Sequence, residues 1–131
     1  QRKMPLHSFG GRYFKAQKMT HSMKLSQSAY FAFKNGGKRV EMRLWDEKRR
    51  AITPGDEIVF ECPTCGRIKV TVENVKVFEN FSALYAYYPA EQLGYAKGEC
   101  PCPEDMNAYY TVSQQQKYGV VAIEPSAPQE V

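Results

Sequence analysis

The chain has 131 residues, of which 43% are hydrophobic and 13% aromatic, and this is enough for one globular domain with its own core. No apolar run approaches the roughly 18 residues of a membrane-spanning helix and no signal-peptide pattern opens the sequence, so we expect a cytoplasmic protein with no membrane partner. The net charge of +4 hides an asymmetry: residues 1–50 hold 13 Lys or Arg against 3 acids, whereas residues 51–131 hold 5 against 11. A polyanion such as nucleic acid is the natural partner of so basic an N-terminal half.

The first third of the chain is predicted to hold a basic appendage, one strand and one helix. Residues 1–20 are basic and show no clear periodicity, so we place them outside the folded domain. Met23-Lys24-Leu25 is typical of a short strand. Ser26 is a good N-cap for a helix over about Gln27–Lys34, and Asn35-Gly36 is expected to end that helix.

The next segment alternates between apolar and polar residues, as a half-buried strand does. Its apolar face is predicted to consist of Val40, Met42 and Leu44. Its polar face is predicted to present Arg39, Glu41 and Arg43, with roughly 6–7 Å between side chains two residues apart. Lys38 lies at the mouth of this strand, and three basic residues follow in a predicted loop: Lys48, Arg49 and Arg50.

A hairpin with a bent second strand is expected in the middle of the chain. Pro54-Gly55-Asp56 predicts a turn, and Glu57–Glu61 then alternates as a strand. After a tight turn the chain returns, and its apolar alternation slips by one residue at Glu73-Asn74, which indicates a β-bulge. Bulges of this kind help small sheets to curl into barrels.

The C-terminal part is predicted to hold short helices and a last strand. Ser82 is expected to cap a helix that ends near Tyr88, and Ser113 with Gln116 forms a capping-box pattern for a further helical turn. Tyr118–Glu124 is the last predicted strand. Five or six short strands interrupted by short helices indicate an α+β fold around a small barrel. The expected organisation is an appendage over 1–20, a domain over 21–125 and a tail over 126–131.

Several motifs resemble the ASCH domain of the PUA-like superfamily, in its bacterial single-domain form. The central motif is Gly37-Lys38-x-x-Glu41-x-Arg43, and later ones are Leu93-Gly94-Tyr95 and Met106-x-x-Tyr109-Tyr110. The resemblance extends from about Met23 to Glu124. It implies a small PUA-like β-barrel of five to six strands with flanking short helices, and a basic cleft that binds RNA or a nucleotide-like ligand.

The resemblance also leaves an enzymatic role open. Members of this family include presumed RNA binders, a ribonuclease and an amidohydrolase that acts on an acetylated cytidine nucleoside. The amidohydrolases are similar around Gly-x-Lys-x-x-Thr-x-Arg, where Lys and Thr are catalytic; Lys38 and Arg43 match this pattern, but Glu41 stands at the Thr position. The alternative function is therefore hydrolysis of RNA or of a modified cytidine nucleoside, with Lys38 and Glu41 as candidate catalytic residues.

The chemistry of the basic segment suits nucleic acid independently of the resemblance. Arginine grips phosphate through its planar fork, lysine adds a mobile charge, and a glutamate between two cations can orient them or accept from a ribose hydroxyl. Trp45 would either stack on a base or complete the core. The other reading of the strand is a purely structural Glu–Arg pair. The candidate nucleic-acid-binding residues are Lys38, Arg39, Arg43, Trp45, Lys48, Arg49 and Arg50.

Four cysteines suggest a separate possibility. Cys62-x-x-Cys65-Gly66 at the hairpin tip has the spacing of a zinc knuckle, and Cys100-x-Cys102 would add two further thiolates. The alternatives are a structural zinc ion, reduced free thiols and redox chemistry of the thiols. A zinc knuckle would in turn favour a third function, a protein-interaction module.

Overall fold

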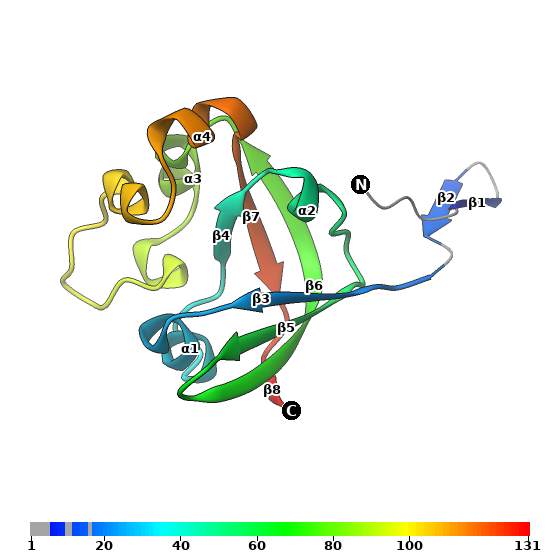
Figure 1. The fold of residues 1–131 in the computed structure, drawn as a ribbon, viewed down its shortest axis with the longest axis horizontal. Helices are drawn as coiled ribbons and strands as arrows, with labels where there is room; N and C mark the ends of the chain where they lie inside the picture. The colour runs from blue at the N-terminus through cyan, green and yellow to red at the C-terminus, as the bar shows by residue number, and fades with distance from the viewer. Residues whose placement is uncertain (1–5, 10–11, 16) are drawn as a thin grey trace.

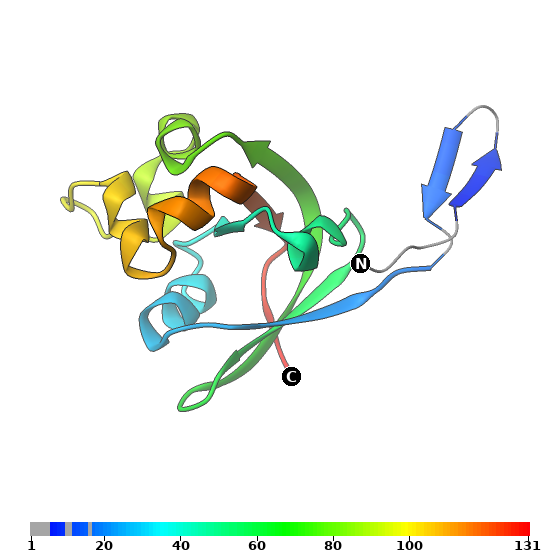
Figure 2. The same ribbon diagram turned by 45° about the horizontal axis from the view of Figure 1, so that its top comes forward.

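The structure, a computed structural model, describes residues 6–9, 12–15 and 17–131, and side chains are described from residue 17 onward. Part of the predicted appendage of residues 1–20 therefore lies outside the described residues. Its described backbone forms an antiparallel hairpin of β1 (Leu6–Phe9) and β2 (Arg12–Lys15). This hairpin is a sheet of its own, and both views show it apart from the rest of the fold (Figures 1 and 2).

The main sheet has six strands and curls into a half-barrel, which confirms the predicted α+β fold (Figure 1). Its strand order is β3-β5-β6-β7-β4, and β8 pairs with β6. The pairing of β3 with β5 is parallel and every other pairing is antiparallel. The strands are β3 (Thr20–Lys24), β4 (Glu41–Leu44), β5 (Glu57–Cys62), β6 (Gly66–Phe78), β7 (Val120–Pro125) and β8 (Gln129–Glu130).

The long strand β6 joins the two sides of the curl. Its first half pairs with β5 and its second half with β7, and the register shifts between Val72 and Asn74. This shift confirms the bulge predicted at Glu73-Asn74. A bulge bends a strand and increases its twist, so one strand can serve both sides of a strongly curved sheet.

Short helices cover the ends and one side of the sheet, and in Figures 1 and 2 most of them gather on the side away from the hairpin. None of the helices formed by the described residues is long and apolar enough to cross a membrane. They are α1 (Gln27–Lys34), α2 (Glu47–Arg50), α3 (Phe81–Tyr87), α4 (Val112–Tyr118) and two 3₁₀ helices, η1 (Ala90–Leu93) and η2 (Pro103–Ala108).

Helix α1 begins and ends as predicted. The Ser26 hydroxyl accepts a hydrogen bond from the backbone N–H of Ala29. Tyr30 and Phe33 turn into the core, and the Asn35 N–H donates to the carbonyl oxygen of Phe31 at the helix end. An N-cap hydrogen bond is local, and this is why the sequence predicts it well.

Other helix starts differ from the prediction, in each case because another residue supplies the cap. The predicted loop at Lys48–Arg50 is helix α2, whose N-cap Asp46 accepts from the Arg49 N–H. Helix α3 is capped by Asn80 and not by Ser82, since the Asn80 side chain accepts from the Ala83 N–H at 2.9 Å.

Helix α4 also differs from the prediction, and this changes where the last strand begins. Its capping box is formed by Thr111 and Gln114, two residues before the predicted pair of Ser113 and Gln116. Tyr118 consequently belongs to α4, and β7 begins at Val120. The chain after β7 adds β8, which pairs with Ile68 and Lys69 of β6.

Two apolar clusters form the core and share β7. Val121 and Ile123 join the cluster inside the curl, together with Phe33 of α1 and residues of β5 and β6. Val120 and Ala122 join the second cluster, which packs against α3, η1 and η2. Because β7 is buried on both faces, its sequence is an apolar run without alternation.

The Pro54-Gly55-Asp56 turn buries the Asp56 carboxylate completely. Asp56 Oδ2 lies 2.8 Å from His21 Nε2 and accepts from the backbone N–H of Thr53 at 3.1 Å. Asp56 Oδ1 accepts from the backbone N–H of Met19 at 3.1 Å. The carboxylate thus ties the start of β3 to the start of β5.

We expect Asp56→Asn to lower the free energy of unfolding by about 1–3 kcal/mol, since an amide nitrogen cannot accept the bonds that one carboxylate oxygen accepts. Urea denaturation followed by circular dichroism measures the change. Glu79→Gln, at an exposed site, is the control and should change stability by less than about 0.5 kcal/mol. Equal effects of the two substitutions would contradict the structural role of Asp56.

Candidate functional site

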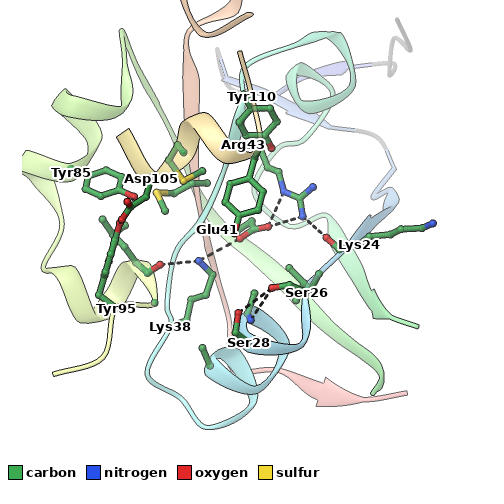
Figure 3. Close-up of a pocket in the computed structure, with 18 of the residues that line it drawn as sticks. Lys24, Ser26, Ser28, Lys38, Glu41, Arg43, Tyr85, Tyr95, Asp105 and Tyr110 are labelled. Carbon is green, nitrogen blue, oxygen red and sulfur yellow. Dashed lines mark hydrogen bonds and ion pairs between the residues drawn. The ribbon is translucent and has the colours of Figure 1, made fainter. Parts of the chain in front are cut away.

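A cleft of about 710 Å³ lies between α1, β4 and the helical segments of the C-terminal half (Figure 3). We call it the main cleft. One wall carries Lys38, Glu41 and Arg43 from β4 and the chain just before it, and Ser26 and Ser28 from the start of α1 line another part. The facing wall carries Tyr85, Tyr95 and Asp105 (Figure 3), and Glu99, Tyr109 and Tyr110 also line the cleft.

The Lys38 side chain is only 7% exposed, and several groups contact it. Its Nζ donates to the carbonyl oxygen of Leu93 at 3.0 Å and lies 3.5 Å from Glu41 Oε1 (Figure 3). The Nζ also lies 5.3 Å from the centre of the Phe33 ring. Burial lowers the pKa of Lys38, and the Glu41 carboxylate opposes only part of that shift.

Gly94 leaves the room that Lys38 occupies. A Cβ at Gly94 would lie 3.3 Å from Lys38 Cδ, and the backbone there has φ +106°. A side chain at this position would be crowded and strained at once. The Leu93-Gly94 segment therefore positions Lys38 in two ways. The Leu93 carbonyl accepts a hydrogen bond from Lys38, and Gly94 leaves space for the lysine side chain.

Glu41 and Arg43 form a tight ion pair on β4. Glu41 Oε2 lies 2.8 Å from Arg43 Nε and 2.7 Å from Arg43 Nη2, and the Glu41 side chain is 7% exposed. Burial by itself would lower the pKa of Arg43, but the Glu41 carboxylate and the Tyr110 side chain together outweigh it and hold that pKa above its ordinary value. Arg43 therefore carries a permanent charge at the cleft.

Arg43 also joins the two edges of the curled sheet. Strands β3 and β4 stand at opposite ends of the strand order and do not pair. Arg43 Nη2 donates to the carbonyl oxygen of Lys24, the last residue of β3, at 2.7 Å (Figure 3). A side chain thus bridges the half-barrel where no strand pairing does.

A hydrogen-bonded tyrosine network supports the facing wall. The Tyr85 and Tyr95 hydroxyl oxygens lie 2.9 Å apart, and the Tyr95 hydroxyl donates to Asp105 Oδ2 at 2.6 Å. Burial raises the pKa of Tyr85 and of Tyr95, so both hydroxyls remain protonated donors at neutral pH. Tyr109 is different, because 69% of it is exposed.

A second, smaller hollow of about 430 Å³ shares a wall with the main cleft. We call it the basic groove. Lys24 and Arg43 line both hollows, while the groove alone is lined by Lys48 and Arg49 of α2, Arg67 of β6, Glu61 of β5 and the smaller residues Ser22, Met23 and Val59.

The two hollows divide the predicted binding residues. Lys38 and Arg43 line the main cleft; Arg43, Lys48 and Arg49 line the basic groove. Arg39, which is exposed, precedes β4 and lines neither hollow.

Trp45 and Arg50 also lie outside both hollows. Trp45 packs against the core cluster inside the curl, which agrees with the structural alternative for this residue. The Arg50 guanidinium lies over the Trp45 ring at 5.7 Å, and its Nε donates to the Trp45 carbonyl oxygen at 2.9 Å.

Sequence reasoning missed several lining residues. The sequence predicts Lys24 only as part of a strand and does not single out Arg67. Tyr85, Tyr95 and Asp105 come from segments that give no local sign of meeting. Alternation does place Lys24 on the solvent face of its strand, but nothing local brings β3 beside β4.

The predicted zinc ligands are not brought together. Cys62 Sγ and Cys65 Sγ lie 3.7 Å and 3.8 Å from Thr64 Oγ1 at the hairpin tip, whereas Cys102 Sγ donates to Glu104 Oε1 in a different loop. All four cysteines are free thiols. Over the described ranges, no three His, Cys, Asp or Glu side chains are arranged to hold a metal ion.

The buried amine of Lys38 predicts a pH dependence of stability. Its pKa in the folded chain lies below the ordinary 10.5, so at pH values between the two the unfolded chain binds more protons. The contribution of Lys38 to the unfolding free energy should therefore rise as the pH increases toward 10.5. The measurement is the difference in stability between the wild type and Lys38→Met across this window, since the tyrosines titrate in both proteins. A difference that stays constant would contradict the burial of the ammonium group.

Comparisons with known proteins agree with this architecture. The sequence profile of the ASCH domain matches residues 23–129. The crystal structure of hypothetical protein PH0355 is 34% identical and aligns with a TM-score of 0.72 over 85% of this chain and 100% of that one. The solution structure of protein PF0455 from Pyrococcus furiosus is 35% identical, with a TM-score of 0.63 over 86% of this chain and 100% of that one.

A more distant structure shares the fold alone. The crystal structure of ASCH from Zymomonas mobilis is 14% identical and has a TM-score of 0.61 over 85% of this chain and 69% of that one. No curated protein matches the chain significantly. The profile match and the two relatives above 30% identity, together with the curled six-stranded sheet, place this chain in the ASCH domain family, with its PUA-like fold.

Proposed function

We propose that the main cleft binds a nucleotide unit of RNA. The observation that carries this proposal is the Lys38–Glu41–Arg43 cluster on one wall of an open cleft that four tyrosines also line. The cleft volume of about 710 Å³ lies in the range of small-ligand sites. Cations, a hydrogen-bond acceptor and aromatic rings are the three groups that a phosphate, a ribose or base edge and a base require.

Each group has a distinct task in this proposal. Arg43 supplies a permanent positive charge for a phosphate, since Glu41 engages only part of its guanidinium fork. Glu41 orients both cations through its two oxygens. Tyr109 at the cleft offers its exposed ring to a base, a contact typically worth about 1–3 kcal/mol.

Fluorescence anisotropy with labelled single-stranded RNA across a salt series tests the proposal. We expect binding at about 50 mM salt that weakens steeply toward about 200 mM, because phosphate contacts release counterions. Tyr109→Ala should weaken binding, whereas Tyr87→Ala, at another exposed tyrosine outside both hollows, should not. An absence of affinity at low salt would refute the proposal, and so would equal effects of the two tyrosine variants.

A hydrolytic role of the same cleft is the second candidate. The observation in its favour is the buried amine of Lys38, whose lowered pKa suits a general base or nucleophile. Against it, Glu41 offers only acceptor oxygens, and these engage Arg43 and Lys38 where the similar amidohydrolases have a hydroxyl. Incubation with an acetylated cytidine nucleoside and with labelled RNA decides between the two: turnover that Lys38→Met abolishes while the protein stays folded would support hydrolysis.

A further inference from the structure

We infer that the basic groove holds the sugar-phosphate backbone of nucleotides that continue from the main cleft. The partner is then a single strand of several nucleotides and not a free nucleotide. This inference rests on the proposed function and adds a second binding surface to it.

The two hollows are adjacent, because they share part of their lining. Lys24 and Arg43 line both of them, and the Arg43 guanidinium is fixed at their border by Glu41 on one side and by the Lys24 carbonyl on the other. In this inference, a strand that leaves the main cleft past Arg43 reaches the basic groove next. Arg43 and Lys24 are thus both placed to contact phosphates on either side of the border.

The charges of the groove are strongly unbalanced. Its lining includes five cations, namely Lys24, Arg43, Lys48, Arg49 and Arg67, and a single acid, Glu61. Arg43 pairs with Glu41 and Arg49 with Asp46. Among the described side chains, Lys24, Lys48 and Arg67 have no ion-pair partner. Unpaired cations gathered in one concave surface raise the local concentration of a polyanion.

The strand register spaces these cations along the groove. Lys24 of β3 pairs with Glu61 of β5, which pairs in turn with Arg67 of β6. Neighbouring strands lie about 4.8 Å apart, so the Cα atoms of Lys24 and Arg67 are about 10 Å apart. Lys48 and Arg49 come from α2. Cations spread over such a span suit successive phosphates better than one isolated phosphate group.

The lining of the groove also distinguishes backbone contacts from base contacts. Its lining residues include no aromatic side chain, whereas the main cleft has four tyrosines. A surface of cations without rings binds phosphates and does not stack on bases. In addition, Arg49 Nε is buried without a hydrogen-bond partner in the part of the chain that is described, which is uncommon unless a ligand or water completes the site.

A length series of RNA tests the inference. Anisotropy or calorimetry should be carried out with a mononucleotide and with oligonucleotides of about two, four and eight residues. The groove predicts that affinity increases with length beyond the first nucleotide. It also predicts that the double variant Lys48→Ala/Arg67→Ala binds the octamer about tenfold more weakly, with a salt slope reduced by about 1.4, while its affinity for the mononucleotide is unchanged.

Two further variants sharpen this test. Lys76→Ala/Lys117→Ala also removes two positive charges, but at sites outside both hollows. This variant should keep the wild-type affinity for the octamer and the wild-type salt dependence. Glu61→Gln removes the one acid of the groove and should strengthen octamer binding about threefold. The outcomes that overturn the inference are an affinity independent of length and equal losses in the two double variants. Both leave the proposed function standing, whereas an absence of binding at every length refutes the proposed function as well.

Discussion

Replacing Glu41 by Gln should lower the free energy of unfolding by about 3–5 kcal/mol, the usual cost of leaving buried charges without their partner. The Glu41 carboxylate is the acid that engages both Lys38 and Arg43. All three side chains are at most 14% exposed, so water cannot replace the lost carboxylate. Glutamine keeps the shape of the side chain but not its charge, and the two cations would then face each other unscreened.

Chemical denaturation of four proteins measures this effect: the wild type, Glu41→Gln, Lys38→Met and the double variant. We expect Lys38→Met to be tolerated better than Glu41→Gln, because it removes a buried cation and keeps an apolar chain of similar length. The double variant should recover part of the loss, since one unpaired cation is then absent. Glu73→Gln, on the exposed side of β6, is the control. A loss from Glu41→Gln as small as that of the control would mean that the cluster does not act as a buried network.

Replacing Arg43 by Ala should weaken RNA binding about 100-fold at low salt. Arg43 lines both hollows and carries a permanent charge, so in the proposed complex its removal would affect both the nucleotide in the main cleft and the backbone in the basic groove. Truncating one side of a buried, hydrogen-bonded charge contact typically costs 2–5 kcal/mol or more, and a 100-fold loss lies within this range. Arg43→Lys should lie between the wild type and Arg43→Ala, because lysine keeps the charge but not the fork.

Arg50→Ala is the matched control for this experiment. Arg50 also donates from its guanidinium to a backbone carbonyl, but it lies outside both hollows. Binding is measured by anisotropy, and thermal unfolding of each variant reports how far the loss of the bridge to Lys24 destabilises the fold. Equal losses of affinity in Arg43→Ala and Arg50→Ala would contradict the assignment of the cleft. They would indicate instead that RNA responds only to net charge.

Local features of this chain could be predicted because short-range interactions determine them. The cap of α1 depends on Ser26 and a backbone N–H three residues later. The bulge of β6 appears in the sequence as a slip in apolar alternation, and the structure places the register shift between Val72 and Asn74. Where prediction failed, two similar local patterns competed: Thr111 and Ser113 are both followed three residues later by Gln, and the structure uses the first.

The candidate site was predictable only in part. Lys38, Glu41 and Arg43 lie within six residues of one another, so one strand could place them together. The carbonyl of Leu93, the space left by Gly94 and the Lys24 carbonyl that binds Arg43 come from two other segments. They meet the cluster only because the sheet curls and carries β3 toward β4, which is a consequence of long-range pairing.

By itself, the sequence determined that this chain is an α+β domain with a basic first half, and its motifs identified the strand that carries the ionic cluster. Composition, alternation and caps act over a few residues, so they can be read without knowledge of the fold. Only the tertiary structure decided which cations share a surface. Arg39 and Arg50 lie outside both hollows, whereas Lys24 lines both of them and Arg67 lines the basic groove. The reason is that the neighbours of a side chain across a curled sheet are set by strand order and register, which depend on the burial of the whole core.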